Sequence, residues 1–330
     1  MRRSFSALIT LVILSLVIVG CEQGEQLQTD VQKALAKHAE MNNYRFSGSA
    51  ELKVDLFDST ADHHMNPLTA SLLILITNSK LTWEGVASVE PVKVELKLQL
   101  TPHSLQQTLD IPLLIQDNKM YLHIPAINEN DEYYEIDLAA LSEQADLAPS
   151  ASPNIDVWNA AQLFSSSLSD LITTIEPKRF EDTTSKDAEL QTISVTLMQK
   201  QVKEVIDSLF TALPTIVDPY SKAGLIQPET AEAWMQKWNE EQHNSWLERT
   251  DEITLNDPIS LMFKLDEAGF ARESQLKFNM TMASDSQGAR TWSINMVNRY
   301  DEINQNPPFT MEAPTNTKSF ADVMNFMSAK

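Results

Sequence analysis

The chain has 330 residues, 42% of them hydrophobic, and its 46 Asp and Glu residues outnumber 25 Lys and Arg residues, which leaves a formal net charge of −21. This acidic balance argues against nucleic-acid binding, because a phosphate backbone requires a basic footprint. The hydrophobic fraction is typical of a folded protein, and the length is enough for one large domain or two small ones. A single cysteine excludes disulfide bonds within the chain.

The N-terminus has the layout of a secretion signal. Arg2 and Arg3 precede an uncharged apolar run from Phe5 to Val19. At about 1.5 Å of rise per residue, a helix over this run would be about 22 Å long, which is shorter than the roughly 30 Å hydrocarbon core of a bilayer. We therefore predict a signal peptide over residues 1–20 that is removed, in preference to a transmembrane span.

The only cysteine, Cys21, lies directly after this apolar run. The residues Ile18-Val19-Gly20-Cys21 resemble the lipobox of bacterial lipoproteins, in which small residues precede a cysteine that is lipidated and becomes the new N-terminus. Two acyl chains would hold the protein stably at a membrane without a spanning helix. We predict lipidation at Cys21 and a membrane-anchored location outside the cytoplasm, on the cell surface or in the periplasm. The alternatives are an ordinary signal peptide and a buried structural cysteine.

A helix and a long strand are predicted after the anchor. Apolar or small residues recur at nearly helical spacing between Glu25 and Met41, which predicts a helix within an N-terminal unit over residues 21–43. From Tyr44 onward, strict alternation of apolar and polar residues predicts a strand with one buried face. Its inward positions include Phe46, Leu52 and Val54.

Alternation continues in the middle of the chain. Residues 92–100 read VKVELKLQL, and every second residue is apolar, which predicts a long antiparallel strand. Residues 119–124 predict a shorter strand, whereas residues 67–78 are apolar almost all round and predict either a helix or a buried strand. The inward positions of the long strand include Val94, Leu96 and Leu98.

The segment around residues 146–250 is predicted to be a helical insertion. It begins with the linker-like stretch DLAPSASP, and helical spacing of apolar residues follows over residues 157–175 and 200–213. Pro228 opens a third helical run, because proline suits the first turn of a helix. Alternating strands occur on both sides of the insertion, so we predict one half-barrel domain over residues 44–330.

Alternating runs near the C-terminus predict antiparallel hairpins. The turn chemistry of Asp266–Gly269 lies between two such runs, and another run begins at Arg290. Each run has one apolar face and one polar face, which is typical of an antiparallel sheet with one solvent-exposed face. Their inward positions include Phe278, Met280, Trp292, Ile294 and Met296.

The order of these elements resembles envelope lipoproteins of the lipoprotein-carrier-like (LolA/LppX-like) superfamily. The resemblance rests on the lipobox, the short helix, YRFSGSAELKVDL, NKMYLHIP with a following YYEIDL, and late hairpins such as FKLDEAGFARESQLKFNM. It implies an α+β fold in which a strongly curved antiparallel sheet, an incomplete barrel, has helices packed on its concave face. It also implies that the concave apolar face can hold acyl chains. The candidate apolar-ligand face comprises Phe46, Leu52, Val54, Val94, Leu96, Leu98, Phe278, Met280, Trp292, Ile294 and Met296.

Common catalytic motifs do not occur in the sequence. It contains no GxSxG elbow, HExxH helix, GxGxxG or phosphate-binding glycine loop, so we expect no enzyme activity, no catalytic residue and no cofactor. Asp62, His63 and His64 have metal-ligand chemistry, but such residues in a polar loop are more often solvated, so we expect no metal site. The run WNEEQHNSW at residues 238–246 predicts a solvated helix face.

The apolar face is therefore the feature of the sequence that indicates a function. Alternating Leu, Met and Trp residues are what any sheet needs for its core, so a filled core is the plainer interpretation. The counts of 13 Met, 12 Phe and 6 Trp favour an adaptable apolar cavity. We predict a non-enzymatic lipoprotein that binds a lipid or an acylated molecule. The alternatives are a tethered scaffold or sensor-associated protein, with a filled core and an acidic surface that binds an envelope protein, and a binder of metals or cationic ligands.

Overall fold

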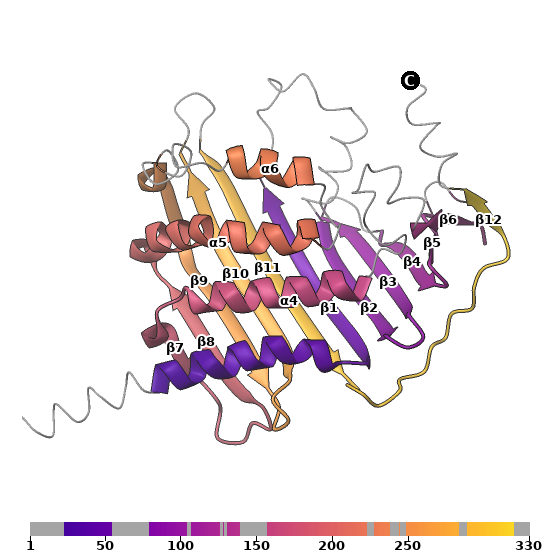
Figure 1. Cartoon of the computed structure of the whole chain (residues 1–330), viewed down its shortest axis with the longest axis horizontal. Coiled ribbons are helices and arrows are strands. Elements are labelled where there is room, and N and C mark those ends of the chain that lie inside the picture. The colour runs from indigo at the N-terminus through magenta and orange to yellow at the C-terminus, as the bar shows by residue number, and fades with distance from the viewer. Residues whose placement is uncertain are drawn as a thin grey trace, which may run out of the picture.

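The computed structural model describes residues 23–54, 79–103, 107–125, 128, 131–138, 157–222, 228–237, 244, 249–283 and 289–319. Within these ranges, twelve strands form one sheet in the order β12-β6-β5-β4-β3-β2-β1-β11-β10-β9-β8-β7. The neighbouring strands are antiparallel, except that β12 is parallel to β6. The sheet is strongly curved and does not close on itself, which confirms the predicted α+β fold with an incomplete barrel (Figure 1).

The strands are β1 (Asn43–Val54), β2 (Ser79–Ser88), β3 (Lys93–Pro102), β4 (Leu109–Gln116), β5 (Lys119–Leu122), β6 (Tyr133–Asp137), β7 (Phe180–Asp182), β8 (Gln191–Leu197), β9 (Ile253–Leu265), β10 (Ala271–Met282), β11 (Arg290–Asp301) and β12 (Thr317–Ser319). The helices are residues 23–36, α4 (Val157–Thr173), α5 (Val202–Lys222) and α6 (Pro228–Lys237), and the short 3-10 turns are η1 (Lys37–Glu40), η2 (Pro177–Arg179), η3 (Gln199–Gln201) and η4 (Arg249–Glu252).

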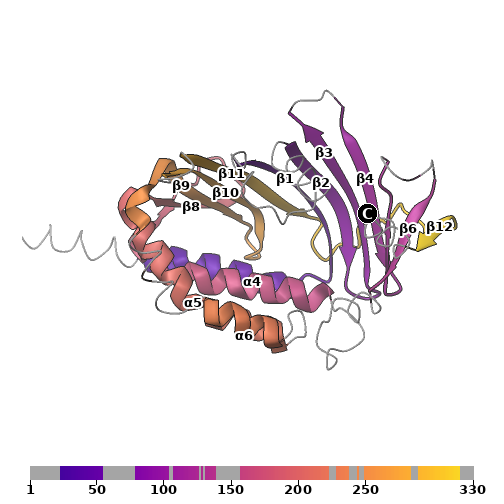
Figure 2. The ribbon, with the colours of Figure 1, turned by 90° about the horizontal axis from the view of Figure 1, so that it is seen from above.

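The helices lie side by side across the concave face of the sheet. The helix over residues 23–36 is drawn in indigo in Figure 1, and α4, α5 and α6 follow it upward across the strands. Figure 2 shows that these helices lie over the part of the sheet from β8 to β1, while β2 to β6 extend beyond them. The two parts of the concave face are therefore covered to different degrees by the described helices.

A filled apolar core occupies one end of this face. The helix over residues 23–36 has apolar residues at helical spacing, as predicted, and they pack against β7 to β10 and the end of α4. Val31, Ile193 and Val195 have 0% of their surface exposed, and no member of the cluster exceeds 7%. Burial of apolar surface contributes about 25 cal/mol per Å², so this cluster holds the first helix on the sheet. Its buried members are Leu27, Val31, Ala34, Leu35, Ile172, Phe180, Ile193, Val195, Leu197, Phe263, Leu265 and Ala271.

The hairpin predicted around Asp266–Gly269 is confirmed. Gly269 has a φ of 84°, a left-handed conformation that glycine adopts readily because it lacks a Cβ atom. The backbone N–H of Gly269 donates to the carbonyl of Asp266 at 2.9 Å, and the Asp266 carboxylate accepts from the backbone N–H of Phe270 at 2.9 Å. These bonds close the turn between β9 and β10.

The sheet contains strands that the sequence analysis did not predict. β2 is one, and β7 and β8 are two more, which lie inside the segment expected to be helical. β8 reads QTISVTL and pairs with β9, with Ile193 opposite Phe263 and Val195 opposite Leu261. The described part of that segment therefore contributes strands to the sheet as well as helices. Residues 67–78, predicted to form either a helix or a buried strand, lie outside the described residues.

A C-terminal strap, residues 302–316, connects β11 to β12 along the outside of the sheet (Figure 1). The Glu95 carboxylate on β3 accepts hydrogen bonds from the backbone N–H groups of Thr310 and Met311, at 2.7 and 2.8 Å. The ammonium group of Lys93 lies 4.9 Å from the ring centroid of Phe309. Leu114, the cross-strand partner of Glu95, is fully buried at 0% exposure. The strap thus covers part of the convex face.

Candidate functional site

The register of the sheet brings the predicted ligand-face residues together. Cross-strand partners share a face, and β1 pairs with β11, which pairs with β10. Leu52 is opposite Ile294, which is opposite Phe278, and Met280 is opposite Trp292. The remaining members lie on β1, β3 and β11, at positions whose cross-strand partners belong to the same face. All eleven positions are therefore on the helix-facing side of the sheet, and for Val54 this describes the backbone position alone.

These residues are not packed as tightly as the core beside them. Of the eleven, the ten whose side chains the structure describes are all half-buried, and none is fully buried. On the same side of the sheet, Ile193 and Phe263 belong to the filled core, with 0% and 7% of their surface exposed. We call the helix-facing positions of β10, β11, β1, β2 and β3 the inner floor. The inner floor is apolar and partly accessible.

Two aromatic rings lie flat on the inner floor. A Cβ atom on Gly48 would collide with the indole of Trp83, and a Cβ atom on Gly85 would collide with the ring of Phe46. Each ring therefore occupies the space above a glycine on the neighbouring strand. The two glycines make this close approach of ring and backbone possible, because any larger residue would lift the ring.

An aromatic group with a half-buried histidine lies at the end of the floor where the first helix meets the sheet. The His38 ring is 4.9 Å from Tyr300, whose ring is 5.7 Å from Tyr44. Burial lowers the pKa of His38 despite a hydrogen bond with the backbone of Ala271, and its Nε2 atom is buried without a partner. Burial also raises the pKa of both tyrosines. The lowered pKa favours the neutral imidazole of His38, and the place of His38 in the apolar spacing between Glu25 and Met41 is the sequence signal for this contact.

Polar groups on the inner floor are few. The indole N–H of Trp292 is buried and makes no hydrogen bond, although a buried tryptophan N–H usually finds an acceptor. Ser274 and Asn298 lie opposite each other on β10 and β11. The sequence analysis did not single out this pair, although both residues stand where the alternation calls for an apolar side chain.

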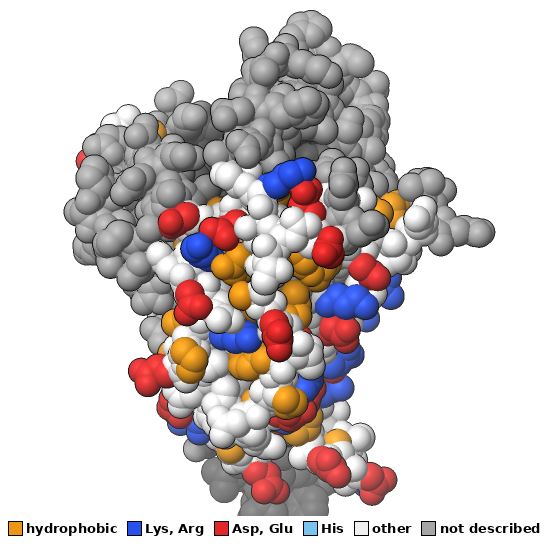
Figure 3. Space-filling model, turned by 90° about the vertical axis from the view of Figure 1, so that its right-hand side faces the viewer, with side chains coloured by type: hydrophobic (Ala, Val, Ile, Leu, Met, Phe, Trp, Pro, Cys, Tyr) orange, Lys and Arg blue, Asp and Glu red, His pale blue; other side chains and the backbone are white. Residues whose placement is uncertain are grey.

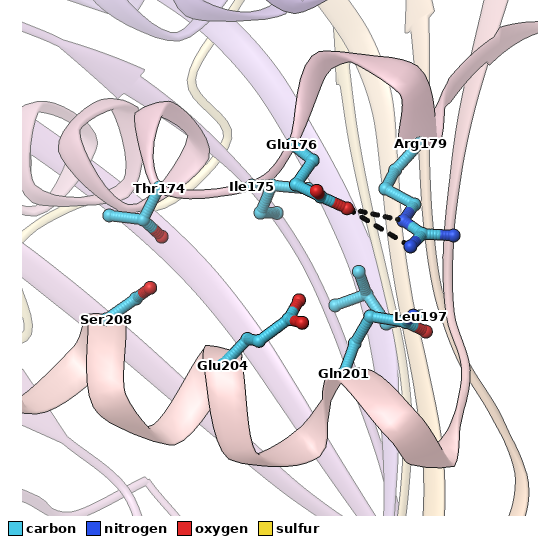
Figure 4. Close-up of a pocket in the computed structure, with 8 residues that line it drawn as sticks. All are labelled: Thr174, Ile175, Glu176, Arg179, Leu197, Gln201, Glu204 and Ser208. Atoms are coloured by element: carbon cyan, nitrogen blue, oxygen red, sulfur yellow. Dashed lines mark hydrogen bonds and ion pairs between the residues drawn. The ribbon is translucent and has the colours of Figure 1, made fainter.

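A small pocket lies away from the floor, at the end of α4 (Figure 4). Its lining includes Thr174, Leu197 and Glu204, and its cavity volume is about 30 Å³. Glu176 accepts hydrogen bonds from Lys178 and Arg179 at its rim, and these bonds lower the pKa of the carboxyl group against a smaller effect of burial. A cavity of this size holds a water molecule or two, whereas ligand pockets measure roughly 300–1,000 Å³. It is not a site for a lipid.

The outer surface carries charges of both signs. Figure 3 shows acidic and basic side chains interspersed with uncharged ones on the side of the molecule near β6 and β12. Lys119 pairs with Glu135 at 2.7 Å, and Lys318 pairs with Glu132 at 2.8 Å. The Lys119–Glu135 pair is largely exposed, and such pairs contribute little to stability, whereas Glu132 is buried beneath Lys318. This end of the molecule is therefore more charged than the inner floor.

Other candidate chemistry is limited in the described part of the chain. Its residues include no group of three or more His, Cys, Asp or Glu side chains that could hold a metal ion. Residues 62–64, residues 238–243 and Cys21 lie outside the described residues. Among the helices that the structure describes, none has both the length and the apolar character needed to cross a membrane.

Comparisons with known proteins add little to this picture. No protein-family profile matches the chain, and no curated protein matches it. Among solved structures, the chain is similar to LprF from Mycobacterium bovis, with a TM-score of 0.34 and 8% sequence identity, over 88% of this chain and 97% of that one. A similarity of this size does not support an assignment of function. The class of protein is therefore defined by the fold itself, a curved antiparallel sheet with helices on an apolar concave face.

Proposed function

We propose that this chain is a non-enzymatic, membrane-anchored lipoprotein outside the cytoplasm that binds a lipid or another apolar ligand on the inner floor. The observation that supports the proposal is the state of the candidate ligand face, whose ten described side chains are all half-buried, including those on β10, β11 and β1, where helices lie over the strands. A ligand chain placed there would remove this surface from water, which is worth about 0.8 kcal/mol for each buried CH₂ group.

The side chains of the floor suit ligands of variable shape. Met280 and Met296 stand beside Phe278 and Ile294 on β10 and β11. Methionine is unbranched and polarisable, so it adapts to irregular apolar surfaces better than a branched residue does. We infer that the floor accepts flexible acyl chains rather than one rigid ligand.

The proposed anchor would place the folded body directly at the membrane. The first helix begins at Gln23 and Gly24 is already buried, so only Glu22 lies between Cys21 and the first helix. An extended chain spans at most about 3.6 Å per residue, which limits the distance from Cys21 to Gln23 to roughly 7 Å. Acyl chains on Cys21 would therefore hold the domain close to the lipid surface, where a lipid ligand is available.

Native mass spectrometry with lipid extraction tests the binding proposal. Residues 22–330 would be purified without detergent, and a co-purifying lipid at about one per protein is the expected result. A ligand-free mass that stays unchanged after incubation with lipids would contradict the proposal and favour the tethered scaffold with a protein partner. The mass of the mature N-terminus of the full chain, purified from membranes, tests the anchor, because an unmodified N-terminus would exclude lipidation at Cys21.

A further inference from the structure

Ser274 and Asn298 interrupt the apolar inner floor on β10 and β11. They are direct cross-strand partners on β10 and β11, and Asn298 is also the partner of Gly48 on β1. Two observations place the pair on the concave side. Ser274 is opposite Phe263, a member of the filled core, and Gly48 lies beneath the indole of Trp83, which belongs to the floor.

The positions on either side of this pair are apolar. In one direction along the strands, Leu276, Met296 and Ala50 form the next row across β10, β11 and β1. In the other direction, Tyr300 and Phe46 are cross-strand partners. On β10, β11 and β1 this row carries the small residues Ser274, Asn298 and Gly48, and the Trp83 indole lies over Gly48. The pair is therefore a short polar interruption between two apolar rows, with an aromatic ring beside it.

Among the described residues, neither side chain of the pair has a hydrogen-bond partner, although both are half-buried. Some polar residues on the convex side of the same strands do form hydrogen bonds. There, the amide of Asn279 donates to Asp257 at 3.2 Å, and the guanidinium group of Arg299 donates to Glu273 at 2.6 Å. A polar group that is taken out of water without a partner is unfavourable. The inner pair thus offers unused hydrogen-bonding capacity on the apolar side of the sheet.

We propose that Ser274 and Asn298 bind the uncharged polar group of an amphiphile, such as an ester, amide or hydroxyl group, while its acyl chain lies on the apolar rows. This inference rests on the proposed function. An amide supplies two donors and an acceptor, and a hydroxyl supplies both roles, so the pair matches such groups without a charge.

The charges of the protein argue for a neutral ligand. The described floor positions from Phe46 to Leu52 and their partners on β2, β3, β10 and β11 carry no Lys, Arg, Asp or Glu residue. A carboxylate or phosphate beside this pair would be desolvated without a cation next to it, because Arg290, on the same face of β11, lies at the other end of that strand. A formal net charge of −21 would also repel an anion from a distance. The pair therefore discriminates against anionic lipids.

Competition binding on the full chain tests this inference. The neutral fluorophore N-phenyl-1-naphthylamine would be displaced by monooleoylglycerol, by oleate at pH 8, or by octadecene, which has no polar group. The test variant is Ser274→Ala with Asn298→Leu. The control is Asn295→Leu, which makes the same change on the same strand but on the convex side, where Asn295 is exposed.

We expect the test variant to bind monooleoylglycerol about tenfold more weakly, since a net hydrogen bond of about 1.4 kcal/mol corresponds to a factor of ten. Octadecene binding would stay the same or become tighter, and the control would match the wild type for all three ligands. Monooleoylglycerol binding that is equal in wild type and test variant would overturn the role of the pair and leave the proposed function intact. Tighter binding of oleate than of monooleoylglycerol by the wild type would also overturn it. A wild-type chain that binds none of the three would overturn the proposed function itself.

Discussion

The two ends of the concave face differ although their sequences follow the same pattern. On β8, Ile193 and Val195 alternate with polar residues and are fully buried. On β11, Ile294 and Met296 alternate in the same way and are only half-buried. The difference comes from the helices, because the apolar stripe of residues 23–36 fills the space over β8 and β9. Alternation thus marks an apolar face, but the covering elements decide whether it is a core or a floor.

The sharpest test of this comparison replaces one phenylalanine at each end. Phe263→Ala in the filled core is expected to lower the free energy of unfolding by about 3–5 kcal/mol, because a cavity is left in tightly packed surroundings. Phe278→Ala on the inner floor is expected to cost about half as much, since that ring is already partly exposed. Urea denaturation followed by circular dichroism measures both. Equal losses would mean that the floor is packed as a core and would remove the basis for the comparison.

A second test fills the space beneath an aromatic ring of the floor. Gly48→Val is expected to lower the free energy of unfolding by about 2 kcal/mol, because the new side chain collides with the indole of Trp83 and forces the strands to shift. The double variant Gly48→Val with Trp83→Ala should recover part of this loss in the same denaturation experiment. If the double variant does not recover any free energy of unfolding, the collision with the backbone of β11, and not the collision with the indole ring, causes most of the loss.

A third test addresses the convex side, where the strap performs the covering role. Burial alone would raise the pKa of Glu95, but hydrogen bonds from Thr310 and Met311 and the charge of Lys93 together lower it. Glu95→Gln is expected to lower the global free energy of unfolding by about 1 kcal/mol or less. Hydrogen exchange at the amides of Thr310 and Met311 should nevertheless become faster. Unchanged exchange at these two amides would show that the carboxylate does not hold the strap.

The smallest expected effect is a pH dependence from His38. Burial lowers its pKa in the folded state, so above its ordinary value of 6.5 both folded and unfolded states are neutral and the residue has no effect. As the pH falls below 6.5, the unfolded state takes up a proton more readily than the folded state, so stability decreases. Tyr44 and Tyr300 remain neutral throughout, because their pKa values are raised. Urea denaturation between pH 7.5 and pH 5 should show this decrease in the wild type and a flatter profile in His38→Phe. Equal slopes would assign the decrease to other groups.

Several features of this protein follow from the sequence alone. Alternation identified the strand faces of β1, β3, β10 and β11, because side chains in a strand point to opposite sides in turn. Helical spacing identified residues 23–36 and α4 as helices with an apolar stripe, and the Asp266–Gly269 turn followed from residue types that tolerate its backbone geometry. These are local properties, in which a residue and its near neighbours carry the physical cause.

Other features were decided by the tertiary structure, because they depend on residues far apart in the chain. β8 was not predicted because its alternating residues are Ser and Thr, which are equally common in loops, and its burial against Phe263 comes from contact with a distant strand. The composition and partial burial of the inner floor also depend on residues that are far apart in the chain. Only the pairing of β10, β11 and β1 brings Ser274, Asn298 and Gly48 into one row, and only the packing of distant segments over the sheet leaves these residues half-buried. Packing between distant segments, which no local pattern encodes, turned one apolar face into a core at one end and a candidate ligand site at the other.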